Sequence, residues 1–87
     1  MTPTEIKARI FDLQEENKKL KAQIEKLKKS IREKIYQLSE DYFLSVEIAN
    51  ATVLKELVLA YEEGLKKLQQ NNQEIQALRE KLKFLED

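Results

Sequence analysis

The chain of 87 residues contains no cysteine, histidine or tryptophan, and it has one glycine and one proline. Without cysteine there can be no disulfide and no thiol nucleophile, and without histidine the usual imidazole base and zinc ligand are missing. No Gly-rich phosphate loop is present either. These absences predict a protein that is not an enzyme and that holds no metal or cofactor.

The scarcity of glycine and proline also leaves few positions marked for loops, which favours long helices. Hydrophobic residues make up 41% of the chain, charged residues 37% and aromatic residues 7%. This composition fits a long helix or coiled coil better than a compact globule of the same size, which would bury little core. The longest apolar run is residues 57–61, too short to span a membrane, and no signal peptide is visible, so we expect a cytoplasmic protein without a membrane partner.

The net charge is zero, but the charges are unevenly distributed. Residues 1–34 carry 10 basic and 6 acidic side chains, whereas residues 35–65 carry 1 basic and 6 acidic side chains. A modest excess of this kind is not typical of nucleic-acid-binding proteins, and acidic residues dilute it. We therefore interpret the basic run as the solvated exterior of a coiled coil rather than a phosphate-binding or lipid-binding surface; it comprises Lys18, Lys19, Lys21, Lys26, Lys28, Lys29, Arg32 and Lys34.

A helix start is marked at the N-terminus. Thr2, Pro3 and Glu5 have the spacing of an N-cap, a first-turn proline and the acidic partner of a capping box. Beyond this start, apolar residues alternate in steps of three and four, which is the heptad seam of a coiled coil. The expected seam is Ile6, Ile10, Leu13, Asn17, Leu20, Ile24, Leu27 and Ile31, and then, after Tyr61 and Gly64, Leu68, Asn71, Ile75, Leu78, Leu82 and Leu85.

The two heptad blocks are out of phase by two residues. Steps of four, three and four residues connect them through Ile31, Ile35, Leu38, Tyr42, Val46, Ala49, Val53, Leu57, Ala60 and Gly64. Such an eleven-residue repeat keeps a nearly straight stripe on one helix. We therefore predict an all-α fold with one continuous helix of roughly 80 residues, on the order of 120 Å long, forming a parallel coiled coil. The chain would be a single unit, 1–87, with a heptad zipper at 6–31, an apolar centre at 31–64 and a second heptad block at 64–85.

The alternative is a helical hairpin with a turn near residues 39–42, in which Ser39 could cap the second helix. Charges next to the seam bear on this choice. A hairpin in which Asn17 meets Asn71 would bring Glu16 beside Glu74, which argues against that register, whereas a shift by one heptad restores attractive pairs. In a parallel dimer all flanking pairs are attractive: Glu16 with Lys21, Glu74 with Arg79, and Lys81 with Glu86.

Asn17 occupies a seam position between isoleucines, where a buried amide costs stability but sets register and favours two strands. We expect it to pair with Asn17 of a second chain, so that Asn17→Ile would raise stability and relax the choice of oligomer. Residues 6–31, with Leu13, Leu20 and Leu27 seven apart around Asn17, resemble a leucine zipper. The resemblance implies dimerisation, but the basic helix that reads DNA in zipper transcription factors is missing before Leu13.

The centre of the chain is apolar on more than one face. Beyond the predicted stripe, residues 42–61 add a set of hydrophobic side chains that a two-stranded coil would leave in water. They predict either a further self-assembly surface, with dimers pairing into tetramers, or a groove for a partner helix. This candidate partner-binding patch comprises Phe43, Leu44, Ile48, Leu54, Val58 and Leu59.

Together these patterns predict a non-enzymatic coiled coil that self-associates and binds other proteins, in a structural, scaffolding or adaptor role. One alternative is a small dimeric helical hairpin that binds RNA through a basic face, in the manner of plasmid copy-control RNA-binding bundles. Another is a chain engineered for helical assembly.

Overall fold

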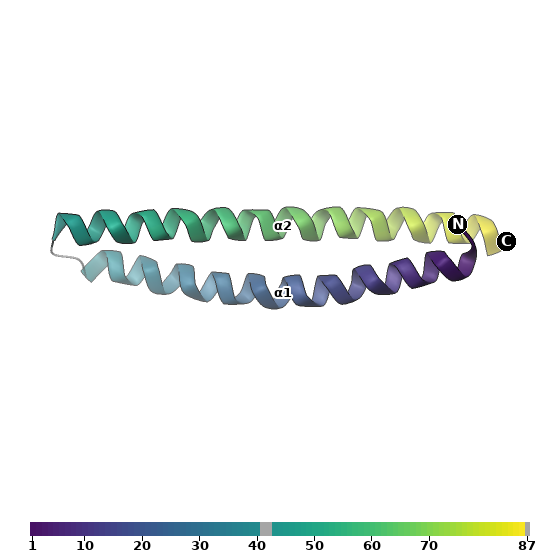
Figure 1. The fold of residues 1–87 in the computed structure, drawn as a ribbon, viewed down its shortest axis with the longest axis horizontal. Coiled ribbons are helices and arrows are strands. Elements are labelled where there is room, and N and C mark those ends of the chain that lie inside the picture. Colours follow the sequence, from purple (N-terminus) through teal and green to yellow (C-terminus); the bar gives the residue numbers. More distant parts are fainter. Residues whose placement is uncertain (41–42, 87) are drawn as a thin grey trace.

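The protein is a helical hairpin. A computed structural model describes residues 1–40 and 43–86, except for the side chains of residues 39 and 40. Helix α1, Pro3–Glu40, and helix α2, Leu44–Glu86, lie side by side and antiparallel in a rod of 66 × 14 × 14 Å (Figure 1). The all-α prediction is confirmed. The predicted continuous helix in a parallel coiled coil is wrong, and the hairpin alternative is correct.

The chain reverses direction between Glu40 and Leu44 without glycine or proline, close to the turn expected at 39–42. Residues 41 and 42, which the expected turn included, lie outside the described residues. Ser39, the expected cap of the second helix, belongs to α1 by its backbone, and its side chain lies outside the described part of the structure. The residue before α2 is Phe43, whose carbonyl accepts a hydrogen bond from the Glu47 N–H at 3.0 Å.

The start of α1 follows the sequence signal. The Glu5 N–H donates to Thr2 Oγ1 at 3.2 Å, and the Thr2 hydroxyl donates to Glu5 Oε1 at 3.1 Å. Pro3 is the first helical residue, where a missing N–H removes no helical hydrogen bond. The predicted N-cap at Thr2 is therefore confirmed, and the Glu5 carboxylate pairs with the Thr2 hydroxyl; Ile6, one residue further on, is completely buried.

The interface between the helices is a heptad seam along its whole length. On α1 the seam continues beyond Ile31 through Lys34 and Leu38, and on α2 it passes through Asn50, Leu54 and Leu57; all are half-buried. The predicted eleven-residue stripe is wrong, because its members Ile35, Val46 and Val53 are 53%, 46% and 40% exposed. The two heptad blocks lie on different helices, α1 and α2, which face each other. Their phase difference of two residues therefore does not have to be bridged within one helix.

Two contacts define the register. Asn71 hydrogen-bonds to Asn17, and Gly64 faces Ile24, and in both contacts the two residue numbers add up to 88. The same rule places Leu13 opposite Ile75, both of which are buried. The layers from Ile6 to Ile24 thus combine one residue from the first predicted heptad block with one from the second.

This is the register that the charge argument rejected, and the argument was wrong. Glu16 pairs with Lys67 at 3.9 Å and Arg9 pairs with Glu74 at 2.9 Å, while Asn17 still meets Asn71. A residue next to the seam on one helix lies between two such residues of the other helix, which are seven positions apart. Glu16, for example, lies between Lys67 and Glu74, and its long side chain reaches the oppositely charged Lys67. Of the pairs proposed for a parallel dimer, Glu16 pairs with Lys67 in place of Lys21, and Glu74 pairs with Arg9 in place of Arg79. These exposed ion pairs contribute only tenths of a kcal/mol each.

Gly64 allows a close approach of the helices at a seam position. A Cβ added at Gly64 would lie 3.2 Å from Cγ1 of Ile24, and the surrounding hollow of about 300 Å³ is lined by Leu20, Leu27 and Ala60 among others. The space beside Ile24 lets its side chain shift by the few tenths of an ångström that an alanine methyl group needs.

We expect Gly64→Ala to raise the free energy of unfolding by up to about 1 kcal/mol, because alanine is the better residue within a helix by roughly that amount. Urea unfolding followed by circular dichroism would measure the change. The larger Gly64→Leu, as a matched variant, should destabilise the hairpin by overfilling the same layer. A loss of stability in Gly64→Ala would show that Ile24 cannot move.

Candidate functional site

A layer of three asparagines crosses the seam in the half of the hairpin near the chain ends. Asn17 Nδ2 donates to Asn72 Oδ1, and Asn71 Nδ2 donates to Asn17 Oδ1, both at 3.0 Å. Asn17 and Asn71 are only 7% and 3% exposed, while Asn72 is exposed. Each buried amide therefore has a partner, which is the condition for placing a polar group in an apolar interface.

The layer changes the role predicted for Asn17. Its partners come from the other helix of the same chain, not from Asn17 of a second chain. Asn71, which the heptad spacing placed on the seam, is buried, whereas its neighbour Asn72 is exposed. The buried amides thus act within one chain, where sliding α2 by one heptad would leave them facing apolar side chains.

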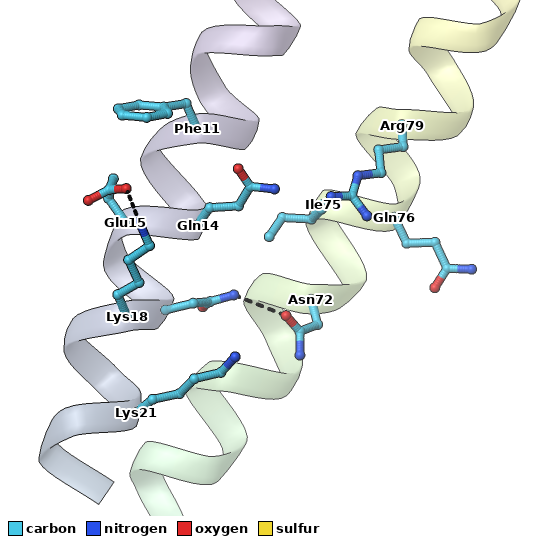
Figure 2. A pocket seen from close by; sticks show the side chains of 10 residues that line it. Phe11, Gln14, Glu15, Lys18, Lys21, Asn72, Ile75, Gln76 and Arg79 are labelled. Atoms are coloured by element: carbon cyan, nitrogen blue, oxygen red, sulfur yellow. Dashed lines mark hydrogen bonds and ion pairs between the residues drawn. The ribbon is translucent and has the colours of Figure 1, made fainter.

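A polar groove opens beside this layer on one side of the hairpin. It has a volume of about 600 Å³. Figure 2 shows Gln14 and Lys21 reaching from α1 toward α2, with Asn72 facing them from α2. We call this the groove side; the groove is lined by Phe11, Gln14, Glu15, Asn17, Lys18, Lys21, Asn72, Ile75, Gln76 and Arg79.

The groove combines cations, amides and an exposed aromatic ring. Lys18, Lys21 and Arg79 are exposed at its rim, and Phe11 is 60% exposed at its edge. Lys18 pairs with Glu15 at 2.9 Å. The surroundings are cationic and rich in hydrogen-bond donors, which suits an anionic ligand better than an apolar one.

The predicted oligomer seam lies between the two helices of one chain. Its members Ile6, Leu13, Asn17, Ile24 and Ile75 are buried, whereas Leu85, near the end of α2, is 50% exposed. The remaining members are half-buried: Ile10, Leu20, Leu27, Ile31, Leu68, Leu78 and Leu82.

The candidate partner-binding patch is largely exposed. Phe43 and Leu44 are 73% and 71% exposed, and Ile48, Val58 and Leu59 are 59%, 42% and 51% exposed. Leu54 is the exception, because it is half-buried at a seam position.

Three apolar residues that the sequence did not mark as exposed are exposed as well. Ile35, Tyr36 and Leu65 are 53%, 69% and 41% exposed. The signal for Leu65 was present, because it continues a stripe on α2 with a spacing of seven residues, next to the seam. We call Leu44, Ala51, Val58 and Leu65 the apolar stripe; all four are exposed.

The apolar stripe and the groove lie on the same side of the hairpin. Continuing the stripe by steps of seven along α2 leads to Asn72 and Arg79, which line the groove. On α2 that side is thus apolar in the turn half, which comprises residues 28–40 and 43–65, and polar and cationic in the open half, which comprises residues 1–27 and 66–86. On α1 the cations Lys28 and Arg32 continue along this side into the turn half.

The seam of the turn half contains a second polar contact. Lys34 Nζ donates to Asn50 Oδ1 at 3.3 Å, and both residues are half-buried. The sequence analysis placed neither residue on the seam. Within the described part of the turn half no residue is buried, so its packing is looser than that of the open half.

Two other kinds of site are not found in the described residues. No three acidic side chains among residues 1–40 and 43–86 gather as metal ligands. Neither α1 nor α2, as far as the structure describes them, combines the length and apolarity needed to cross a membrane.

The chain matches no protein-family model, and neither the curated proteins nor the solved structures compared with it show a significant similarity. Function is therefore inferred from the surfaces of the hairpin.

We expect Asn17→Ile to lower the free energy of unfolding by about 1–3 kcal/mol, because Asn71 would stay buried without its acceptor. This reverses the expectation from the sequence. The double variant Asn17→Ile, Asn71→Leu removes both amides and should recover or exceed the original stability.

Urea unfolding of the two single variants and the double variant would give the coupling energy. Asn72→Ala is the matched control, and it should cost less because Asn72 is exposed. Wild-type stability in Asn17→Ile would mean that Asn71 is satisfied by water instead.

Proposed function

We propose that this chain acts by association rather than catalysis, and that two copies of the hairpin pair through the apolar stripe of α2. The observation that supports this function is the stripe itself: Leu44, Ala51, Val58 and Leu65 are exposed at a heptad spacing on one flank of the seam. Residues 44–65 cover roughly 33 Å of helix, enough for three heptads of a helix–helix interface.

Exposure of these side chains is costly. Fully burying a leucine or valine side chain contributes about 1.5–3 kcal/mol, and contiguous exposed apolar surface usually marks an interaction site. Ile48 and Leu59 lie close to the stripe and are 59% and 51% exposed, so they widen the surface that a partner can cover. A helix packed on this flank would extend the hairpin toward a helical bundle.

A second copy fits the stripe because the stripe is complementary to itself. If two α2 helices pack antiparallel, Leu44 lies opposite Leu65 of the partner subunit, and Ala51 lies opposite Val58 of the partner subunit. Each small residue then faces a larger one, and each end of the stripe faces leucine. The same patch serves both copies, as in the two-fold interfaces that most soluble dimers use.

The charges around the stripe add a condition. Residues 35–65 carry five more acidic than basic side chains, so two copies repel each other across this region. Added salt screens that repulsion and leaves the apolar contact intact. Pairing of the hairpins should therefore strengthen with ionic strength.

We expect Val58→Glu to make the protein monomeric at concentrations where the wild type is dimeric, because a carboxylate would enter the centre of the apolar contact. Val58 is 42% exposed in the hairpin, so the helices should still form. Analytical ultracentrifugation at two salt concentrations, together with circular dichroism, would measure mass and helicity. Phe84→Glu, at an 88% exposed position in the open half, is the matched control and should stay dimeric. A wild type that is monomeric at high micromolar concentration in high salt would contradict the proposal.

The orientation of the two copies can be tested by disulfide formation, because the chain has no cysteine of its own. A mixture of the variants Leu44→Cys and Leu65→Cys should form a cross-linked dimer, whereas either variant alone should not, since its twin lies roughly 30 Å away along the helices. Phe84→Cys mixed with Leu44→Cys is the control without a cross-link. Cross-linking of Leu44→Cys with itself would instead show that the hairpins pair in parallel.

A further inference from the structure

One face of α1 carries a row of cations on the groove side. Lys18, Lys21, Lys28 and Arg32 lie on one line of the helix in steps of three, seven and four residues, and Glu25 is the one acidic residue on that line, between Lys21 and Lys28. The line covers roughly 21 Å at about 1.5 Å per residue. We call these four residues together with Arg79 the basic row.

The hairpin adds Arg79 to this line, which the sequence alone did not show. Arg79 comes from α2 and lines the same groove as Lys18 and Lys21 (Figure 2). The antiparallel register thus brings a cation from one end of the chain to cations near the other end. The result is a two-walled basic groove rather than a single charged helix face.

Three members of the basic row are not neutralised. Lys21, Arg32 and Arg79 form no ion pair with any residue that the structure describes. Lys18 and Lys28 pair with Glu15 and Glu25 within α1 at 2.9 and 3.2 Å, but these pairs join adjacent turns on the exposed surface. Exposed pairs of this kind are weak and can be exchanged for a stronger anion.

The groove also carries side chains with the chemistry to hydrogen-bond or stack with bases. The amides of Gln14, Asn72 and Gln76 can donate and accept hydrogen bonds, and the exposed ring of Phe11 lies at the groove edge. Binding of a single strand commonly combines a cationic groove that follows the phosphates with an aromatic ring on which a base stacks.

We propose that the basic row binds the phosphate backbone of a single-stranded nucleic acid, with the groove amides and Phe11 contacting its bases. A strand can enter the groove of about 600 Å³, whereas a flat anionic bilayer would meet only its rim. Lys18, Lys21 and Arg79 lie in the open half, beyond the end of the apolar stripe, so binding of a strand to these three cations does not depend on pairing of the hairpins. The low net charge of the whole chain does not oppose it, because the acidic excess lies in residues 35–65.

The test is the salt dependence of binding to a fluorescent 20-nucleotide RNA and to the DNA of the same sequence, measured by anisotropy between 50 and 200 mM salt. Contacts from all five cations predict a slope of about −3.5 for log K against log salt with a single strand. The double variant Lys21→Gln, Arg79→Gln should reduce the slope by about 1.4 and weaken both oligonucleotides alike, because phosphate contacts carry no sequence information.

The matched control Lys26→Gln, Lys66→Gln removes the same charge from positions outside the basic row, and it should keep the wild-type slope. Phe11→Ala should weaken binding without changing the slope, because stacking does not depend on salt. Absence of binding at 50 mM salt, an equal loss in the control, or binding confined to phosphatidylserine vesicles would each overturn the proposal. Because nucleic-acid binding weakens with salt while pairing of the hairpins strengthens, failure of one proposal can be distinguished from failure of the other.

Discussion

The antiparallel register of the two helices is the constraint on which every surface of this hairpin depends. The buried amides of Asn17 and Asn71 can satisfy each other only when the two residues lie in one layer. Apolar layers on either side tolerate small shifts, because one branched aliphatic side chain can replace another with little loss. A polar layer tolerates none, since a displaced amide would be buried without a partner. The asparagines therefore add specificity where leucines and isoleucines add most of the burial.

This register also composes the groove side from distant parts of the chain. Arg79 stands across from Lys18 and Lys21 only because α2 runs back along α1 in this alignment. A slip of one heptad would move Arg79 by about 10 Å along the rod and open the groove. The apolar stripe depends on it less, because all its residues belong to α2. The groove side thus combines two kinds of surface: the groove, which needs residues of both helices, and the apolar stripe, which belongs to α2 alone.

Much of this structure can be read from the sequence, but its topology cannot. The N-cap at Thr2, the heptad positions from Ile6 to Ile31 and the exposed apolar patch are local patterns, and local patterns are what a sequence displays directly. Two heptad blocks can pack against each other within one chain or between two chains. Both interfaces bury nearly the same side chains, so the heptad pattern does not distinguish them. The decisive segment, residues 39–42, has neither glycine nor proline to mark a turn. The flanking charges misled because long side chains choose between two partners, so Glu16 reaches Lys67 where Glu74 was expected to repel it.

The distribution of packing along the rod has a consequence for how the hairpin folds. Contacts near the turn, such as Lys34 with Asn50, close a short loop of 16 residues, whereas Asn17 and Asn71 are 54 residues apart. Closing the longer loop first would cost about 1 kcal/mol more in chain entropy. Yet all the fully buried positions of the described chain lie in the open half. The layers near the turn thus cost the least chain entropy to form but bury the least apolar surface. Packing that starts at the turn becomes stable only when it extends to Ile24 and the asparagine layer. The turn half thus contributes the least burial among the described residues, and any molecule that covers it adds apolar contact where the hairpin itself has least.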